Sequence, residues 1–407
     1  MNFTYNPADE SRSAETIANS HDLLIEILVR LPLKSLVRFK SVSEGWNSVI
    51  SDPYFSRRLF PHISGLIIEK LYTLDDNPQY QLIPLTSPGK LTDNASLNFS
   101  LPKGFKIVQS CHGLLLCRKG DSSYYIYNPT TKQFVSLPPN LDTRNSKTNY
   151  LNLAFDPTKS PHYKVVCVRF ADQGLNFSDK PGWNLKKQIE IYSSQTRSWR
   201  LSGNAFTVSG SAFTVPLGYT TFREGVFCNG AIHWINHVDH SMLYFHMDDE
   251  KLGQLPLPNN IPSKLELRYM TYLMECRGHL HLIGTCLPPT ELRVQEIESD
   301  YSGWIVKYHV DLRPLTVAFP ETWPTWPLCY LSFLFIVREA NDEDSYMVLH
   351  LHSQGKVIRL NLKDGHFNKI CDLDPVGNDQ DFPRPFLSNP LSLFSPHHQF
   401  IQTLSSV

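Results

Sequence analysis

Two pairs of histidines are the residues of this sequence whose spacing most resembles a metal site. His279 and His281 are separated by one residue, as are His350 and His352. Because side chains alternate along a β-strand, both imidazoles of each pair would lie on one face, and imidazole is a common zinc ligand. Two ligands do not complete a site, and no Asp, Glu or Cys lies nearby at a recognisable spacing. We therefore expect no metal and interpret these residues as ordinary histidines on the polar faces of strands.

Motifs for catalysis are also absent from the sequence. It contains no G-x-S-x-G elbow, no Walker loop, no G-x-G-x-x-G and no H-E-x-x-H. Carboxylates gather in "MDDEKL" and "EANDEDSY", which are contexts typical of solvated turns. The eight cysteines include no C-x-x-C pair, so we expect reduced thiols used as small core residues. The sequence therefore predicts no catalytic residue and no cofactor.

Charge and hydropathy argue against two classes of partner. Lys and Arg total 38 against 39 Asp and Glu, so the net charge of -1 provides no overall field for nucleic acid or an anionic membrane. The most apolar run, "LCYLSFLFIV", is far shorter than the roughly twenty residues of a membrane span, and we interpret it as a buried strand. Residues 1–19 are polar, without an apolar segment of signal-peptide length. We expect them to be a flexible tail on an intracellular protein, cytoplasmic or nuclear or both.

Residues 20–62 differ from the rest of the chain because their periodicity is helical. The first predicted helix has five apolar side chains at helical spacing: Leu23, Leu24, Ile27, Leu28 and Leu31. Pro32 ends it, "LKSLVRFK" predicts a second helix, and "EGWNSVIS" predicts a third with Ser43 as its N-cap. Three such short helices enclose too little core to be stable alone. Part of their apolar face must be covered, either by the rest of this chain or by another protein, and the physics leaves both open.

The segment "DLLIEILVRLPLKSLVRFKSVSEGWNSVISDPYF" resembles an F-box, the helical module by which substrate receptors dock onto the Skp-type adaptor of cullin-based ubiquitin ligases. Leu-Leu, Glu-Ile-Leu, Leu-Pro, Leu-Val-x-Phe, Val-Ser and Trp occur in the order typical of the family. The pair that usually opens the motif, Leu-Pro, is replaced by Asn19-Ser20. The resemblance implies a set of residues that face the adaptor or support those that do: Leu23, Leu24, Ile27, Leu28, Leu31, Pro32, Leu36, Phe39 and Val42.

From about residue 63 onward, short strands and turns replace the helical pattern. A unit of apolar strand, polar turn, aromatic residue and second strand is clearest in "YYIYNPTTKQFVSLPP", "IEIYSSQTRSWRLSG", "LYFHMDDEKLGQLPLP", "IESDYSGWIVKYHVDL" and "IRLNLKDGHFNKICDL". Each unit predicts a hairpin, and several follow a glycine-centred hairpin: "SCHGLLLC", "CNGAIHWI" and "CRGHLHLIG". The units recur at somewhat over 50 residues, close to the ~50 of a kelch blade. No interval contains a long amphipathic helix, which disfavours a parallel βαβ fold.

This region, including "AFDPTKSPHYKVVCV", resembles the F-box-associated domain of plant F-box proteins, which is similar in layout to kelch-type propellers. We expect an α+β multidomain protein with a flexible tail at 1–19, a three-helix F-box at 20–62 and an antiparallel all-β domain at 63–407. Its length allows roughly six propeller blades. To close the ring, "FNKICDL" or "PLSLF" is expected to pair with the segment around "GLIIEKLYTL".

Together, the two resemblances imply a non-catalytic substrate-recognition subunit of a Skp-cullin-F-box ubiquitin ligase. The F-box would bind the adaptor and, through it, cullin, while the β domain would hold an unknown target protein. One alternative is an F-box scaffold that binds the adaptor without directing degradation, and co-purification of cullin would distinguish it. A less favoured alternative is a propeller enzyme, which a pocket with catalytic chemistry would support. Neither nucleic acid nor a membrane is an expected partner.

Overall fold

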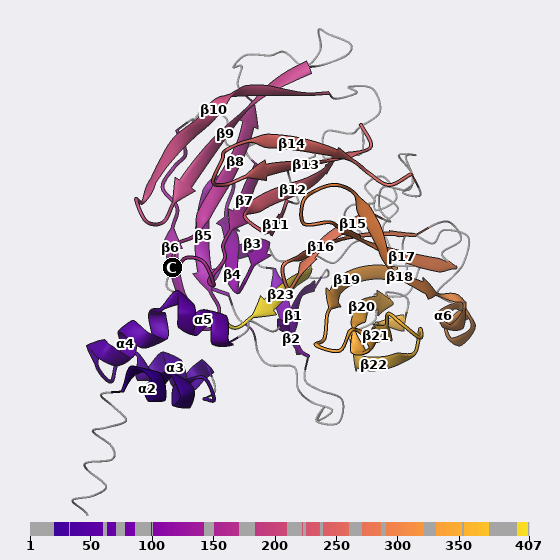
Figure 1. The fold of residues 1–407 in the computed structure, drawn as a ribbon, viewed down its shortest axis with the longest axis horizontal. Helices are drawn as coiled ribbons and strands as arrows, with labels where there is room; N and C mark the ends of the chain where they lie inside the picture. The colour runs from indigo at the N-terminus through magenta and orange to yellow at the C-terminus, as the bar shows by residue number, and fades with distance from the viewer. Residues whose placement is uncertain are drawn as a thin grey trace, which may run out of the picture.

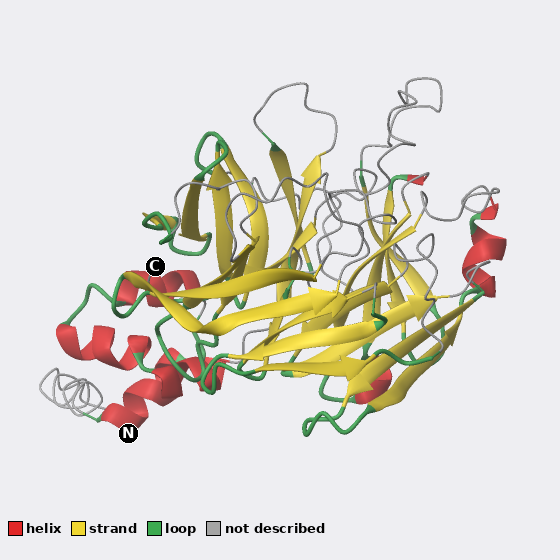
Figure 2. Ribbon diagram, turned by 90° about the horizontal axis from the view of Figure 1, so that it is seen from above, coloured by secondary structure: helices red, strands yellow, loops and turns green. Residues whose placement is uncertain are grey.

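The computed structural model shows a group of short helices at one end of a six-bladed β-propeller (Figures 1 and 2). The structure describes residues 20–31, 33–59, 63–70, 78–85, 99, 101–141, 150–170, 184–209, 222, 225–236, 239–259, 271–285, 290–320, 331–351, 354–373, 397–405 and 407. Within these ranges, every helix is too short or too polar to cross a bilayer. This architecture confirms the predicted fold class.

The helices are α2 (His21–Leu28), α3 (Leu33–Phe39), α4 (Glu44–Ser51) and α5 (Pro53–Leu59). Ser43 caps α4 as predicted, because its hydroxyl accepts a hydrogen bond of 3.1 Å from the Trp46 amide. The structure adds α5 to the three expected helices. Proline is tolerated at the first position of a helix, and the Asp52 carboxylate accepts a hydrogen bond of 2.6 Å from the Tyr54 amide. The Asp52-Pro53 pair therefore ends one helix and starts the next.

Five blades are antiparallel four-stranded sheets whose strands follow one another along the chain. In chain order, the first of these blades contains β3 (Phe105–Cys111), β4 (Leu114–Lys119), β5 (Ser123–Asn128) and β6 (Gln133–Ser136), and the second contains β7 (Tyr150–Ala154), β8 (Lys164–Phe170), β9 (Asn184–Ser193) and β10 (Ser198–Ser209). The third contains β11 (Val226–Cys228), β12 (Ala231–Asn236), β13 (Ser241–His246) and β14 (Leu252–Pro256), and the fourth contains β15 (Thr271–Cys276), β16 (His279–Thr285), β17 (Glu291–Ile297) and β18 (Trp304–Asp311). The fifth contains β19 (Leu331–Val337), β20 (Tyr346–Leu351), β21 (Lys356–Asn361) and β22 (Phe367–Asp372). A short helix, α6 (Arg313–Ala318), and a 3-10 turn, η5 (Asp342–Asp344), interrupt them. Every hairpin predicted from the sequence is present.

The outer strands of successive blades are joined by a tryptophan that reaches a proline carbonyl. The indole nitrogen of Trp199 donates a hydrogen bond of 2.8 Å to Pro138, which follows the outer strand of the preceding blade. Trp304 donates in the same way to Pro256, at 3.1 Å. Both tryptophans are half-buried, so the ring packs on the protein while the indole N–H finds a partner. These contacts explain why an aromatic residue and a Leu-Pro pair recur together in the sequence.

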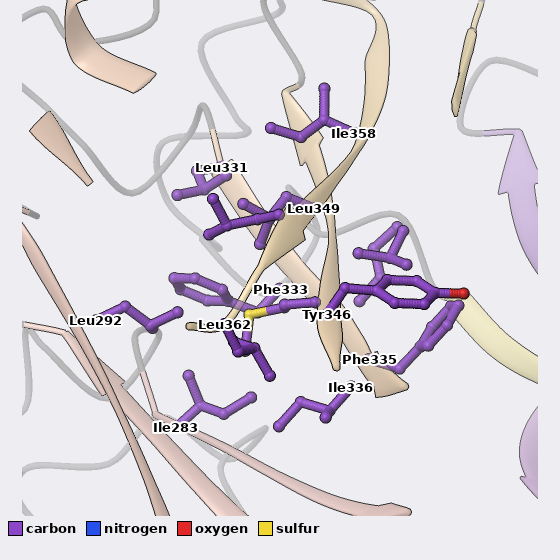
Figure 3. Close-up of a cluster of buried hydrophobic side chains, with 14 of the residues drawn as sticks. Ile283, Leu292, Leu331, Phe333, Phe335, Ile336, Tyr346, Leu349, Ile358 and Leu362 are labelled. Atoms are coloured by element: carbon purple, nitrogen blue, oxygen red, sulfur yellow. The ribbon is translucent and has the colours of Figure 1, made fainter. Parts of the chain in front are cut away.

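The largest apolar core lies between the last blades, around β19 (Figure 3). The first six of the seven residues of β19 are buried, which confirms that "LCYLSFLFIV" contributes a core strand. Phe333 and Phe335 pack with side chains from β16, β17, β20 and β21, including Ile283, Leu292 and Leu349. A strand buried on both faces has a continuous apolar sequence without alternation, as β19 does.

The ring closes through a sheet formed from both ends of the chain. β23 (His397–Ile401) pairs antiparallel with β1 (Ile63–Lys70), which also pairs with β2 (Gln79–Pro84). The prediction that a C-terminal strand joins the "GLIIEKLYTL" segment is confirmed, but the strand proposed for it is wrong. "FNKICDL" forms β22 of the preceding blade, and "PLSLF" lies outside the described residues. The closing strand begins with His397, His398 and Gln399, so it lacks the apolar content by which strands were recognised.

A buried ion pair joins the ends of two innermost strands that are not neighbours. His112, which follows β3, lies 3.3 Å from the Glu275 carboxylate on β15, and its other ring nitrogen is 2.6 Å from the Phe155 carbonyl oxygen. Burial alone would lower the pKa of His112, but the charge of Glu275 and these hydrogen bonds outweigh it and raise the pKa to about 9. Burial acts to raise the pKa of Glu275, but His112 outweighs it, so that pKa is lowered. Both groups are therefore charged near neutral pH.

The closing strand leaves no room for a side chain at the β3–β4 turn. Gly113 has a φ of +93°, and an added Cβ would lie 2.6 Å from the Ile401 carbonyl oxygen. Gly230, with a φ of +83°, occupies the same position in the β11–β12 turn, where an added Cβ would meet nothing within 4 Å. Both turns have the paired positive φ values of a type I′ hairpin. We expect Gly230→Ala to lower the free energy of unfolding by about 1 kcal/mol through backbone strain alone.

Gly113→Ala should destabilise the propeller by roughly 1–3 kcal/mol more than Gly230→Ala, because β23 must also move. Urea unfolding followed by tryptophan fluorescence measures both variants. Equal losses at the two positions would contradict the close packing of β23 against this turn.

The pair of His112 and Glu275 predicts a pH dependence of stability. A raised histidine pKa contributes stability that is fully present below the unfolded value near 6.5 and is lost as pH rises through about 9. We expect the free energy of unfolding to fall by on the order of 1–3 kcal/mol between pH 6.5 and 9.5 through this group. The lowered pKa of Glu275 contributes a constant amount to the free energy of unfolding between pH 6.5 and 9.5. In His112→Gln the decline should be shallower, and parallel curves for the two proteins would contradict the assignment.

Candidate functional site

The helices α2 to α5 share one small hydrophobic core. The fully buried members are Leu28, Leu36, Ile50 and Phe55, each with 0% exposure. The half-buried Trp46 packs edge-on against Phe39, with ring centroids 5.4 Å apart. These contacts hold the four helices together with side chains that the sequence places on their inner faces.

A second apolar face of α2 points away from this core. Leu23 is 47% exposed and Ile27 is 43% exposed, and the two lie one helical turn apart. The neighbouring Glu26 carboxylate forms an ion pair of 2.6 Å with Arg58 on α5. Arg58 lies one turn after Tyr54, which is 56% exposed. The face of Leu23 and Ile27 is therefore an apolar surface beside a fixed charged pair, uncovered by any described part of the chain.

The structure divides the expected adaptor-binding residues by burial. Leu24, Leu28 and Leu36 are buried, Leu31 and Phe39 are half-buried, and Leu23, Ile27 and Val42 are exposed. Pro32 lies outside the described residues. The exposed members can make contact with a partner, whereas the buried ones can only support them. Sequence reasoning missed Tyr54, which a helix starting at Pro53 would have placed on the surface.

The rest of the chain covers the opposite face of the helices. Leu404, near the C-terminus, is 5% exposed and belongs to the same hydrophobic cluster as Leu28 and Leu36. Lys40 donates a hydrogen bond of 2.7 Å to the Leu404 carbonyl oxygen, and burial lowers the pKa of this lysine. Of the two ways to cover the helices, the chain itself therefore supplies one through Leu404, and no described residue covers the face of Leu23 and Ile27.

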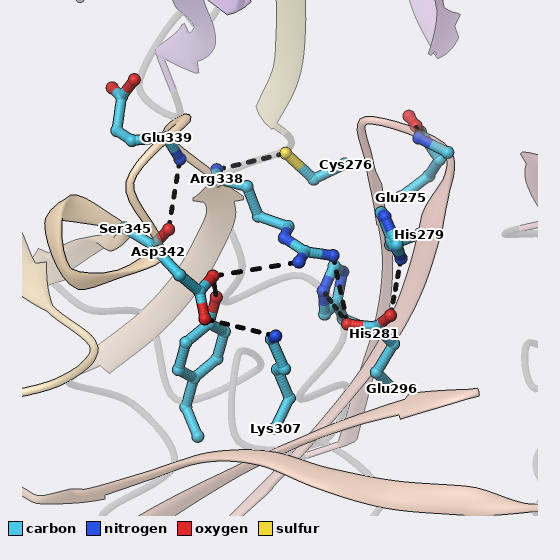
Figure 4. A network of polar contacts seen from close by, with 12 residues as sticks. Glu275, Cys276, His279, His281, Glu296, Lys307, Arg338, Glu339, Asp342 and Ser345 are labelled. Carbon is cyan, nitrogen blue, oxygen red and sulfur yellow. Dashed lines mark hydrogen bonds and ion pairs between the residues drawn. The ribbon is translucent and has the colours of Figure 1, made fainter. Parts of the chain in front are cut away.

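Two of the four histidines considered for metal binding, His279 and His281, are instead part of a salt-bridge network between two blades (Figure 4). Both His279 and His281 approach the Glu296 carboxylate, at 2.6 and 3.5 Å, while Arg338 of the next blade donates to it at 3.1 Å. Arg338 also lies 3.8 Å from Asp342. Burial acts to raise the pKa of Glu296, but its three cationic or hydrogen-bonding neighbours outweigh burial and lower it to about 2. The guanidinium group supplies the positive charge that a metal would otherwise bring.

The interpretation of these histidines as polar-face residues is wrong for two of them. His281 is 0% exposed and His350 is 4% exposed, so neither lies on a solvent-facing side of its strand. His352 lies outside the described residues. No group of three or more potential metal ligands occurs in the described part of the chain. The six described cysteines are free thiols, as expected.

Comparison with protein families and known proteins agrees with this division of the chain. Residues 20–58 match the F-box domain family, and residues 71–308 match the family described as F-box associated beta propeller domain. An F-box protein of Arabidopsis thaliana is 34% identical over 428 aligned residues, which cover 98% of this chain and 94% of that protein. A second F-box protein of Arabidopsis thaliana is 32% identical over 262 residues, covering 59% of this chain and 60% of its own.

Among solved structures, an oligogalacturonate lyase in complex with manganese aligns over 75% of this chain and 74% of its own, with 8% identity and a TM-score of 0.41. Identity at this level says nothing about activity. The two family matches and the full-length relative do establish membership. The chain belongs to the plant-type F-box proteins that carry an F-box-associated β-propeller domain.

Proposed function

We propose that this protein is a non-catalytic substrate receptor of a Skp-cullin-F-box ubiquitin ligase. F-box domains generally bind Skp-type adaptors, and F-box proteins of this type are generally non-enzymatic. The observation that supports the proposal most is the face of Leu23 and Ile27, which stays exposed although the rest of the chain covers the other side of the same helix. Exposed apolar side chains on a short helix are typical of docking onto another helical protein.

The target protein would bind at the end of the propeller away from the F-box. At the F-box end, β3–β4, β11–β12 and β15–β16 are joined by two-residue turns such as His112-Gly113, which present little surface. The strands β8 and β22 end on the opposite side of the propeller, and residues 171–183 and 374–396, which come after them in the sequence, lie outside the described residues. Binding residues are disproportionately placed on loops held by a rigid scaffold. A target held there would lie on the far side of the propeller from the adaptor.

The role of the receptor would be to hold the target near the enzyme that transfers ubiquitin. Fixing two reactants in one complex replaces a bimolecular encounter with a high effective concentration, without any catalytic group on the receptor. This mechanism requires a rigid scaffold rather than a reactive site. The propeller provides such a scaffold through its closed ring and its interblade hydrogen bonds.

We expect the double variant Leu23→Asp, Ile27→Asp to lose adaptor binding. Each substitution would place a carboxylate where an apolar contact is buried, so together they should weaken binding by at least about 100-fold. Isothermal titration with a purified plant Skp-type adaptor measures the change. Leu28→Asp is unsuitable because Leu28 is fully buried and its replacement would unfold the helices.

Leu201→Asp is a matched control, because Leu201 is 52% exposed on β10, far from the helices in sequence and in the fold. It should bind the adaptor like the unmodified protein. Undiminished binding by the folded double variant would show that docking uses another surface. Co-purification of cullin with the wild-type complex then separates a ligase receptor from a scaffold that binds only the adaptor.

A further inference from the structure

The chain passes between the F-box and the propeller at two places. The first is the covalent link from α5, which ends at Leu59, to β1, which begins at Ile63. The second is the segment that follows β23, residues 402–405, here called the C-terminal clamp. It leaves the closing blade at the end of the propeller where the helices lie (Figure 1). Two attachments from opposite ends of the chain restrict rotation that one link would allow.

On the F-box side, the clamp contributes one side chain to the core. Leu404 is 5% exposed and clusters with Leu24, Leu28 and Phe55. Its carbonyl oxygen accepts the 2.7 Å hydrogen bond from Lys40, which follows α3. The F-box core is therefore completed by a residue from the other end of the chain.

On the propeller side, the clamp is held by the first complete blade. Asn128, at the end of β5, is 0% exposed. Its side-chain amide donates to the carbonyl oxygens of Thr403, at 3.2 Å, and Ser405, at 2.7 Å. The Thr403 amide in turn donates to the Thr130 hydroxyl at 3.1 Å. These three hydrogen bonds between the clamp and the blade all involve Thr403 or Ser405.

The alternation of these contacts is what joins the two modules. Thr403 and Ser405 present their carbonyls to Asn128, while Leu404 presents its carbonyl and side chain to the F-box. One short segment thus contacts both modules at once.

We propose that the C-terminal clamp fixes the orientation of the F-box relative to the propeller, with Asn128, Lys40 and Leu404 as positioning residues. The clamp would join the F-box to the propeller whether or not an adaptor is bound. Its consequence for ubiquitin transfer rests on the proposed function: the clamp would set the direction in which a bound target faces. None of these residues belongs to the exposed face of Leu23 and Ile27.

Asn128→Asp removes both hydrogen bonds from this side chain to the clamp and keeps those within its own turn. The Asn128 side-chain oxygen accepts hydrogen bonds from the Thr130 and Thr131 amides, and a carboxylate keeps both. It cannot donate to the Thr403 and Ser405 carbonyls, and its charge repels them. Asn361→Asp is the matched control, because Asn361 accepts from the Lys363 and Asp364 amides in the equivalent β21–β22 turn but donates within its own blade, to Glu343.

The experiment measures the distance between the two modules in the full chain. Spin labels on encoded keto amino acids at the exposed positions Glu44, in α4, and Asp121, in the β4–β5 turn, report it by double electron–electron resonance at pH 7.5. The wild type and Asn361→Asp should each give one narrow distance distribution. Asn128→Asp should give a distribution at least about twice as wide. A narrow distribution in Asn128→Asp would overturn the proposal.

A second pair of variants tests the clamp from the F-box side and decides the matter if Asn128→Asp does not fold. Leu404→Asp should broaden the distribution and Leu404→Met should keep it narrow, because methionine fills a similar volume. Equal widths for the two would overturn the proposal. Adaptor affinity, measured on the same samples, should be unchanged in Asn128→Asp. If the wild-type protein does not bind the adaptor, the proposed function is refuted, while the distance measurements on the clamp remain valid.

Discussion

The structure depends on one constraint, which is that a propeller must close. Each blade buries its faces against its two neighbours, so an open ring would expose the apolar faces of its first and last blades. This chain meets the requirement by pairing β1 with β23, which come from positions more than 300 residues apart. The position of the helices follows from that pairing, because β1 and β23 both reach the end of the ring where the F-box lies.

Much of this fold could be predicted from the sequence because its repeated unit is local. Each outer hairpin contains a turn, an aromatic residue and an apolar strand within about 15 residues, which is short enough for pattern reasoning. The F-box was equally accessible, since its apolar positions follow a helical period and Ser43 is a recognisable cap. The continuous apolar run of β19 identified a buried strand. These elements share one property: the interactions that define them lie close together in the sequence.

The parts that the sequence did not predict depend on distant contacts. β23 contains two adjacent histidines and a glutamine, and only its partner β1 shows that it is a strand. The burial of His281 and His350 follows from the packing of whole blades rather than from their neighbours in sequence. Leu404 could not be assigned to the F-box core, because it lies over 340 residues from the helices that it contacts. The exposed face of Leu23 and Ile27 was distinguishable from the buried face of Leu24 and Leu28 only once the helices were packed against one another.

The position of Leu404 has a consequence for how the protein is made. A ribosome releases the F-box long before it makes Leu404, so until then the emerging helices lack a residue of their own core. The same final segment carries β23 and therefore completes the propeller. A chain that lacked residues 397–404 would thus fail in both modules together, with an unfinished helical core and an open ring. Neither module can be completed before these residues are made, and products without them would expose apolar surface to the quality-control machinery of the cell.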